Sequence, residues 1–223
     1  RNNKLNAKNQ AIDLEQKLLR SQKNPHFIFN SLMAIQSYIY KNDPVQAGDF
    51  LAKFADLVRI TLENSRVEFV LLENEIKMLQ IYLELQALRF NNKFDYSIQI
   101  SEDVDICTIK IPPMLAQPFI ENAIEHGLRH KAEGGFIQVK YVKANKHLSF
   151  SVEDNGIGRE KSRELETDRK HKAMATSITK ERLNLLSKRF KQTFELELID
   201  MKDSNNSPIG TMVKFAIPYL KVD

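Results

Sequence analysis

The sequence predicts an α+β protein in which an all-helical first part is followed, from about residue 92, by a mixed second part. Helical periodicity runs through most of residues 1–90, and strand-like alternation begins only after Asn91-Asn92-Lys93. One further helix, preceded by a double proline, stands between the first alternating segments. We therefore expect the second part to be a sheet with helices covering one of its faces.

Residues 1–22 are predicted to form a helical linker. Leu5, Ile12 and Leu19 recur every seven residues, which is typical of a short two-stranded coiled coil. A surface helix that packs on its own domain fits the same short pattern.

Three more helices are expected in the first part. The first continues past Pro25 to about Ile39. Asp43-Pro44 marks the start of the second, because aspartate is a favoured N-cap and proline is tolerated at the first helical position. The second ends near Asn64-Ser65, and the third spans Glu73–Phe90.

The second part alternates between strands and helices. Phe94–Ile100 alternates like a half-buried strand, and a helix from Met114 to about Leu128 follows Pro112-Pro113. Residues 159–172 have no apolar period and are predicted to be a long mobile loop. The other expected elements are strands at 136–142, 148–152, 194–199 and 211–217 and a helix at 178–190.

The composition narrows the class of protein. The chain has 223 residues, 42% of them hydrophobic and 28% charged, which is ordinary for a globular protein. The net charge of +4 is slight, so nothing indicates direct binding of nucleic acid. Cys107 is the only cysteine, which excludes an intrachain disulfide and a cysteine metal cluster. No apolar run approaches the ~18–20 residues that span a bilayer.

A histidine within the segment Asn24-Pro25-His26-Phe27-Ile28-Phe29-Asn30 is the first candidate for chemistry. A lone histidine on a helix is most often an ordinary surface residue. Here, however, large apolar residues follow it. An imidazole is a good nucleophile when one ring nitrogen is free and the other is held as a donor. Asn30, one helical turn later, is placed to hold that second nitrogen.

The predicted helix 114–128 carries Glu121-Asn122-Ala123-Ile124-Glu125-His126-Gly127. Asparagine prefers helix caps to interiors, so an interior Asn122 needs a hydrogen-bond or metal partner. Its amide oxygen is a hard ligand of the kind that suits Mg²⁺. A purely structural asparagine explains the pattern equally well on its own.

The turn Asp154-Asn155-Gly156-Ile157-Gly158 follows an alternating strand. Many β-turns look like it, so the signal is weak alone. The glycines permit close approach of the backbone to a ligand, and a carboxylate at a strand end can accept a hydrogen bond from an exocyclic amine such as that of adenine.

Together and in this order, these motifs resemble the GHKL-type (Bergerat) ATP-binding domain shared by gyrase, sensor histidine kinases and MutL. The histidine motif, paired with Gln117-Pro118-Phe119-Ile120-Glu121-Asn122-Ala123, is similar to the LytS/YehU-type sensor histidine kinase family over about residues 20–217. The resemblance implies that residues 23–92 are a helical dimerisation and phosphoacceptor region. It implies that 93–223 are an α/β sandwich that binds ATP and Mg²⁺.

The resemblance also implies roles for single residues. His26 would be the phosphoacceptor, and Asn122 would hold the Mg²⁺ that bridges the ATP phosphates, with Glu121 and His126 on the same helix. Asp154 would bind the adenine amino group. The remaining implied residues are Gly156 and Gly158 at the pocket floor and lid hinge, and Lys161, Arg163, Arg169 and Lys172 in an ATP lid at 159–172.

Two departures from the family pattern stand out. Where many relatives have a second glycine motif after the lid, this chain has Ala173-Met174-Ala175-Thr176. Alanine at a position that needs positive φ costs roughly 1–2 kcal/mol, whereas in an ordinary helix it is harmless. Phe27 replaces the acidic residue that follows the histidine in many kinases, and Glu121 is only a conceivable substitute for the missing base.

The expected activity is ATP-dependent autophosphorylation on His26 and transfer to an aspartate of a response regulator, often one with a LytTR DNA-binding output domain. The expected assembly is a homodimer. The family and the start at Arg1, without methionine, favour the cytoplasmic portion of a membrane sensor whose anchor lies upstream. The alternatives are a degenerate nucleotide-sensing scaffold without catalysis and, more remotely, a serine-directed kinase of the anti-sigma-factor kind.

Overall fold

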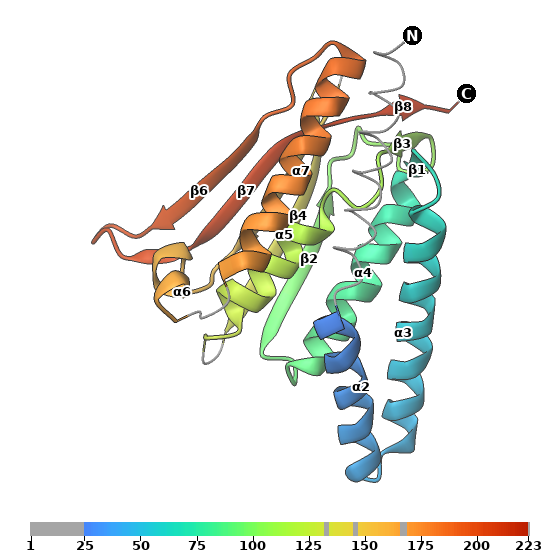
Figure 1. Cartoon of the computed structure of the whole chain (residues 1–223), viewed down its shortest axis with the longest axis vertical. Helices are drawn as coiled ribbons and strands as arrows, with labels where there is room; N and C mark the ends of the chain where they lie inside the picture. Colours follow the sequence, from blue (N-terminus) through green and yellow to red (C-terminus); the bar gives the residue numbers. More distant parts are fainter. Residues whose placement is uncertain (1–24, 132–133, 145–146, 166–168, 223) are drawn as a thin grey trace.

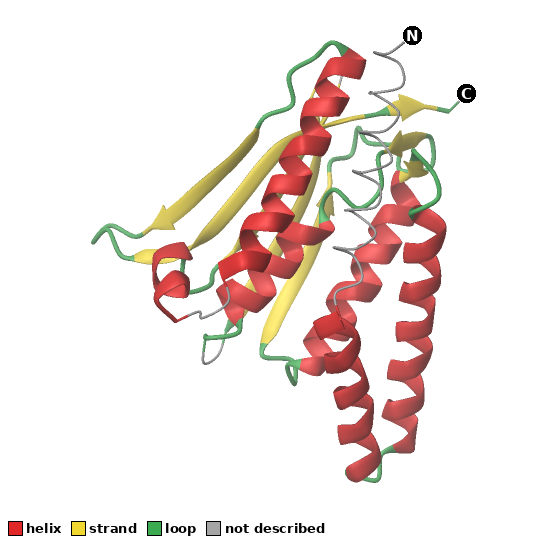
Figure 2. Cartoon of the chain, in the orientation of Figure 1, coloured by secondary structure: helices red, strands yellow, loops and turns green. Residues whose placement is uncertain are grey.

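The computed structural model describes residues 25–131, 134–144, 147–165 and 169–222, and the expected linker at 1–22 lies outside them. A helical hairpin stands beside a layer of helices and a sheet (Figures 1 and 2). In chain order the elements are α2 (Pro25–Tyr40), α3 (Pro44–Asn64), β1 (Val70–Leu71), α4 (Leu72–Arg89), β2 (Phe94–Ile100), β3 (Ile109–Ile111), α5 (Gln117–Asn122), the π-helix η1 (Ala123–Leu128), β4 (Gly135–Ala144), β5 (His147–Asp154), α6 (Arg159–Leu165), α7 (Arg169–Phe190), β6 (Leu196–Lys202), β7 (Pro208–Pro218) and β8 (Leu220–Lys221).

The helical hairpin is formed by α2 and α3. Asp43 caps α3 as expected, because its side chain accepts a hydrogen bond from the Gln46 amide at 3.1 Å and Pro44 begins the helix. The hairpin packs on α4, where Lys53 forms an ion pair with Glu84. The hairpin is therefore attached to the rest of the fold along α4.

The main sheet has the strand order β2-β4-β5-β7-β6. The pair β2 and β4 is parallel, and the other neighbouring pairs are antiparallel. The layer that contains α5 and α7 covers one face of this sheet (Figure 1). The predicted α+β class is confirmed, and the five strands expected from the sequence correspond to the five strands of this sheet.

A second, small sheet joins β1, β3 and β8 in that order, all antiparallel. These strands are only two or three residues long, and the sequence pattern did not predict them. The Val222 amide extends the contact by donating to the Thr108 carbonyl at 2.8 Å. The small sheet thus brings the end of the chain beside the segment that precedes α5.

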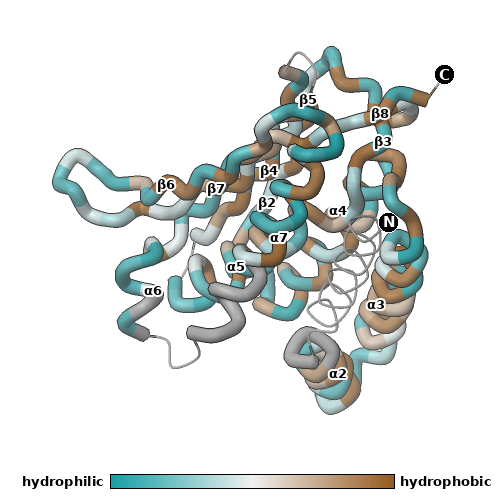
Figure 3. Tube along the Cα trace, turned by 45° about the horizontal axis from the view of Figure 1, so that its top comes forward, coloured by the Kyte–Doolittle hydropathy of each residue, from teal (hydrophilic) through white to brown (hydrophobic). Residues whose placement is uncertain are grey.

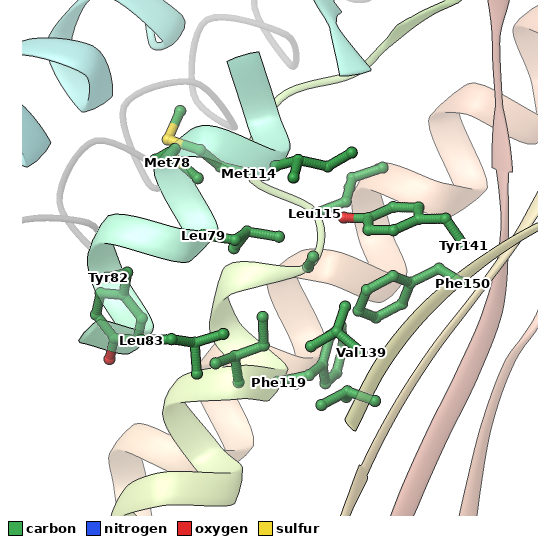
Figure 4. Close-up of a cluster of buried hydrophobic side chains, with 14 of the residues drawn as sticks. Met78, Leu79, Tyr82, Leu83, Met114, Leu115, Phe119, Val139, Tyr141 and Phe150 are labelled. Carbon is green, nitrogen blue, oxygen red and sulfur yellow. The ribbon is translucent and has the colours of Figure 1, made fainter. Parts of the chain in front are cut away.

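One hydrophobic core joins α4, α5 and the main sheet. Figure 4 shows side chains of α4, including Leu79 and Leu83, meeting those of α5 and the strands. Phe150 lies at its centre, with ring centroids 4.8 Å from Phe215 and 5.2 Å from Tyr141. The third helix of the first part, α4, is therefore buried in the same core as the sheet.

Two expectations about helices are wrong. Residues 159–165 and 169–172 form helix rather than a loop, in α6 and the start of α7. The pattern misled because α6 buries a polar residue, Ser162, and shows no apolar stripe. The helix expected at 114–128 begins only at Gln117 and changes from α to π after Asn122.

Candidate functional site

The candidate site is built where the helix carrying Asn122 meets the turn after β5. Asn122 is the last residue of α5, and η1 follows it directly. A π-helix is rare and occurs often at functional sites. The Arg129 amide donates to the Ile124 carbonyl at 2.9 Å, five residues back, at the end of the π turn. Asn122 therefore lies at a change of helix type, with its side chain half-buried.

Glu121 and His126 lie on the same continuous helical segment and are half-buried. The carboxylate of Glu121 is close enough to Tyr82 of α4 to help raise the pKa of that phenol, although burial is the larger cause. Glu121 thus faces α4 at least in part. The next acidic residue on this face, Glu125, accepts a hydrogen bond from Arg89 of α4 at 2.5 Å.

Asp154 ends β5 and is only 5% exposed. Its Oδ1 accepts a hydrogen bond from the Gly156 amide at 2.9 Å, which closes the turn. The Asn155 side chain is structural: its Oδ1 accepts from the Phe136 amide at 2.7 Å and its Nδ2 donates to the Gly134 carbonyl at 3.0 Å. The turn therefore fixes a buried carboxyl group at the end of the central strand of the main sheet.

The turn and the π-helix touch through their backbones. The Ile157 amide donates to the Gly127 carbonyl at 3.1 Å. A Cβ built on Gly156 would lie 2.4 Å from the backbone of Gly127, and one built on Gly127 would lie 2.7 Å from Oδ1 of Asp154. A side chain at Gly156 would overlap backbone, and one at Gly127 would require the Asp154 carboxylate to move. The sequence analysis missed Gly127, although an interior helical glycine costs about 1 kcal/mol relative to alanine and so calls for a packing reason.

Gly158 has φ of +77°, a conformation that favours glycine, and it leads into α6. Lys161 is exposed on α6. Lys131, which the sequence analysis did not single out, donates to the Asn155 carbonyl at 2.8 Å and so places a cation beside the turn. Lys172 lies in α7, and its side chain is outside what the structure describes.

Ala173 and Ala175 lie inside α7. Of the two alternatives, the strained one with positive φ is therefore wrong, and the harmless helical one applies. These alanines were the only sequence feature that favoured a degenerate scaffold, and within a helix they no longer favour it.

His26 lies in the first turn of α2, and its side chain is outside what the structure describes. Asn30 is half-buried one turn later. Within the described residues, no three or more His, Cys, Asp and Glu side chains gather to hold a metal ion, and no helix has the length and hydropathy required to cross a bilayer. The predicted site therefore has two separate halves. His26 lies on the hairpin, whereas Asn122 and Asp154 lie in the layer of helices and sheet.

Known proteins have sequences similar to both the helical part and the mixed part of this chain. A family described as histidine kinase matches residues 14–94. The sensor protein LytS of Staphylococcus saprophyticus is 32% identical over 209 residues, which are 93% of this chain and 34% of that protein. The chain belongs to the LytS-type histidine kinase family. YwpD of Bacillus subtilis is 32% identical over 152 residues, which are 67% of this chain and 53% of YwpD.

The chain spans about a third of the length of LytS and about half of the length of YwpD. A solved structure described as a bacterial phosphotransferase covers 92% of this chain and 96% of its own, with a TM-score of 0.52 and 13% identity. This likeness concerns the fold alone.

Proposed function

We propose that the chain is the core of a sensor histidine kinase that uses ATP and Mg²⁺ to phosphorylate His26. The observation that carries the proposal is the backbone contact between η1 and the Asp154 turn. It brings the motif that ends at Gly127 and the motif that contains Asn155, 28 residues further along the chain, into one site. Family membership supports the same activity.

The residues present fit a nucleotide. Asp154 offers a buried carboxyl acceptor at a strand end, which suits the amino group of adenine. Asn122 offers an amide oxygen for Mg²⁺, which takes most of its other ligands from phosphates and water. Gly156 and Gly158 keep the turn free of side chains, and Lys161 and Lys172 carry charges for the phosphates. Glu121 and His126 line the same helix.

His26 is the proposed phosphoacceptor. When bound, ATP supplies the phosphoryl group, which passes to an imidazole nitrogen as ADP leaves. Such a transfer requires positioning and neutralisation of charge more than covalent chemistry from the protein. Asn30, one turn further along α2, is proposed to hold the other ring nitrogen as a donor, which leaves the attacking nitrogen unprotonated.

A homodimer through α2 and α3 is proposed for the assembly. On α2 the exposed Phe29, Met33 and Tyr40 follow a heptad-like spacing, and they are 66%, 65% and 79% exposed. On α3, Leu51 and Leu62 continue a similar stripe, each 51% exposed. Hydrophobic residues recur along both helices in Figure 3. Apolar stripes of this spacing are typical of helix bundles, and pairing two hairpins would cover them.

The proposed partner is the receiver domain of a response regulator, whose aspartate takes the phosphoryl group from His26. A LytTR output domain on that regulator belongs to the same proposal, with no direct contact between this chain and nucleic acid. The proposed location is the cytoplasmic side of a membrane sensor, because ATP and response regulators are found there. The similarity to LytS, a sensor protein, supports this placement.

The test is incubation with Mg²⁺ and γ-labelled ATP, with wild type, His26→Gln and Asn122→Ala compared side by side. We expect acid-labile label in the wild type alone, together with nucleotide binding that His26→Gln retains and Asn122→Ala weakens. Label that persists in His26→Gln would contradict the assignment of the phosphoacceptor. A wild type that binds no nucleotide would favour the scaffold without kinase activity.

A further inference from the structure

The loop that leads into the helix of Asn122 is unusual in its backbone. It follows β3 and contains Pro112-Pro113 and Met114, all of them buried. Met114 has φ of +57°, in the left-handed region that side chains other than glycine rarely adopt. A conformation of this kind persists only when the surroundings hold it in place.

Glu75 of α4 holds this loop from one side. Its side chain is fully buried, at 0% exposure. Both carboxyl oxygens accept from the Met114 amide, at 3.0 and 3.1 Å. A fully buried carboxyl group is costly and needs a specific reason to be there. Here it binds the amide of Met114, the residue of this loop that has the left-handed conformation.

Arg182 of α7 holds the same loop from the other side. Its Nη2 donates to the Pro113 carbonyl at 2.9 Å, and its Nη1 lies 3.5 Å from the Met114 carbonyl. Burial lowers the pKa of Arg182 to about 10, and the attraction of the nearby Glu75 carboxylate opposes this shift. Arg182 and Glu75 therefore interact electrostatically. The planar guanidinium donates to the two carbonyls from fixed directions, whereas the lysine ammonium is a compact charge on a flexible stem and lacks this rigid fork.

We infer that Glu75 and Arg182 are positioning residues for Asn122. They clamp the Pro113-Met114 loop between α4 and α7 and so fix where the helix of Asn122 begins, three residues after Met114. The inference rests on the proposed nucleotide site, because its purpose is to hold the Mg²⁺ ligand. It also makes α7 part of that support.

The test compares Arg182→Lys with Arg189→Lys, the same substitution two turns further along α7. Arg189 contacts Glu68 and the ring of Phe69 at the protein surface, away from the clamp. In the nucleotide-free protein, amide hydrogen exchange over residues 114–122 should be faster in Arg182→Lys alone, with β4 and β5 unchanged. The Kd for Mg-ATP, measured by calorimetry, should rise about tenfold in Arg182→Lys, since one of two charge-assisted hydrogen bonds is lost. Both quantities should stay at the wild-type value in Arg189→Lys.

Unchanged exchange over residues 114–122 in Arg182→Lys would overturn the clamp. Faster exchange with an unchanged Kd would overturn its role in positioning Asn122. If the wild type itself binds no Mg-ATP, the proposed function fails before any substitution is made, and the clamp is then judged by exchange alone. If Arg182→Lys does not fold, Glu75→Gln combined with Arg182→Met leaves no unpaired buried charge, and the same exchange signature is expected from it.

Discussion

Replacing Glu75 by glutamine should change how the stability of the protein depends on pH. Burial raises the pKa of Glu75 to about 7 from the ordinary value of 4.5, against the Met114 amide and Arg182, which both lower it. The folded state therefore binds a proton that the unfolded chain has already released between these two pH values. The stabilisation from this group is fully present below about pH 4.5 and is lost as the pH rises through about 7.

A shift of this size corresponds to about 3 kcal/mol in the free energy of unfolding, at 1.36 kcal/mol for each unit of pKa. Glutamine keeps an oxygen acceptor for the Met114 amide but does not titrate. Between about pH 4.5 and about pH 8, the free energy of unfolding of the wild type should therefore fall by about 3 kcal/mol relative to that of Glu75→Gln. Urea unfolding of both proteins across this range measures the difference. Parallel pH profiles for the two proteins would refute the reasoning.

Three further predictions follow from single contacts. Gly156→Ala should lower the free energy of unfolding by about 1–3 kcal/mol, because the new Cβ would overlap the backbone of η1. Gly48→Ala in α3 is the control: nothing lies within 4 Å of its Cβ, so it should raise the free energy of unfolding by up to about 1 kcal/mol. Equal effects of the two substitutions in thermal melts would contradict the overlap. Asp43→Ala should lower the free energy of unfolding by about 1 kcal/mol in the same assay, because the N-cap of α3 is lost. An unchanged free energy of unfolding would mean that the cap is not stabilising. Leu51→Glu should convert dimer to monomer in light-scattering chromatography while Val142→Glu on β4, similarly exposed, does not; a dimer that survives Leu51→Glu would exclude this face of α3.

The sequence analysis succeeded where a local pattern carries the information. The cap at Asp43, the alternating strands of the main sheet and the helical position of Asn122 all follow from periodicity and side-chain preference within a few residues. The position of Asp154 at a strand end was likewise readable, because the alternation stops there.

The rest depends on contacts between distant segments. The π-helix after Asn122 has no counterpart in the sequence pattern, and the need for Gly127 arises from the turn at Asp154, which lies far along the chain. Glu75 appeared as one more charge on a helix because nothing nearby in the sequence signals its burial. The helix α6 escaped notice because Ser162, which it buries, is polar. Periodicity detects an apolar face and does not detect burial of another kind.

The small sheet has a consequence for the order in which the molecule is completed. The hairpin of α2 and α3 is made of neighbouring residues and can form while later parts of the chain are still being synthesised. Strand β3 receives its second neighbour only when β8, which follows all the other described elements, is added. The segment just before the Pro113-Met114 loop therefore gains its full pairing only after β8 has been synthesised, so a chain cut before β8 would possess a folded hairpin without a fully supported helix for Asn122.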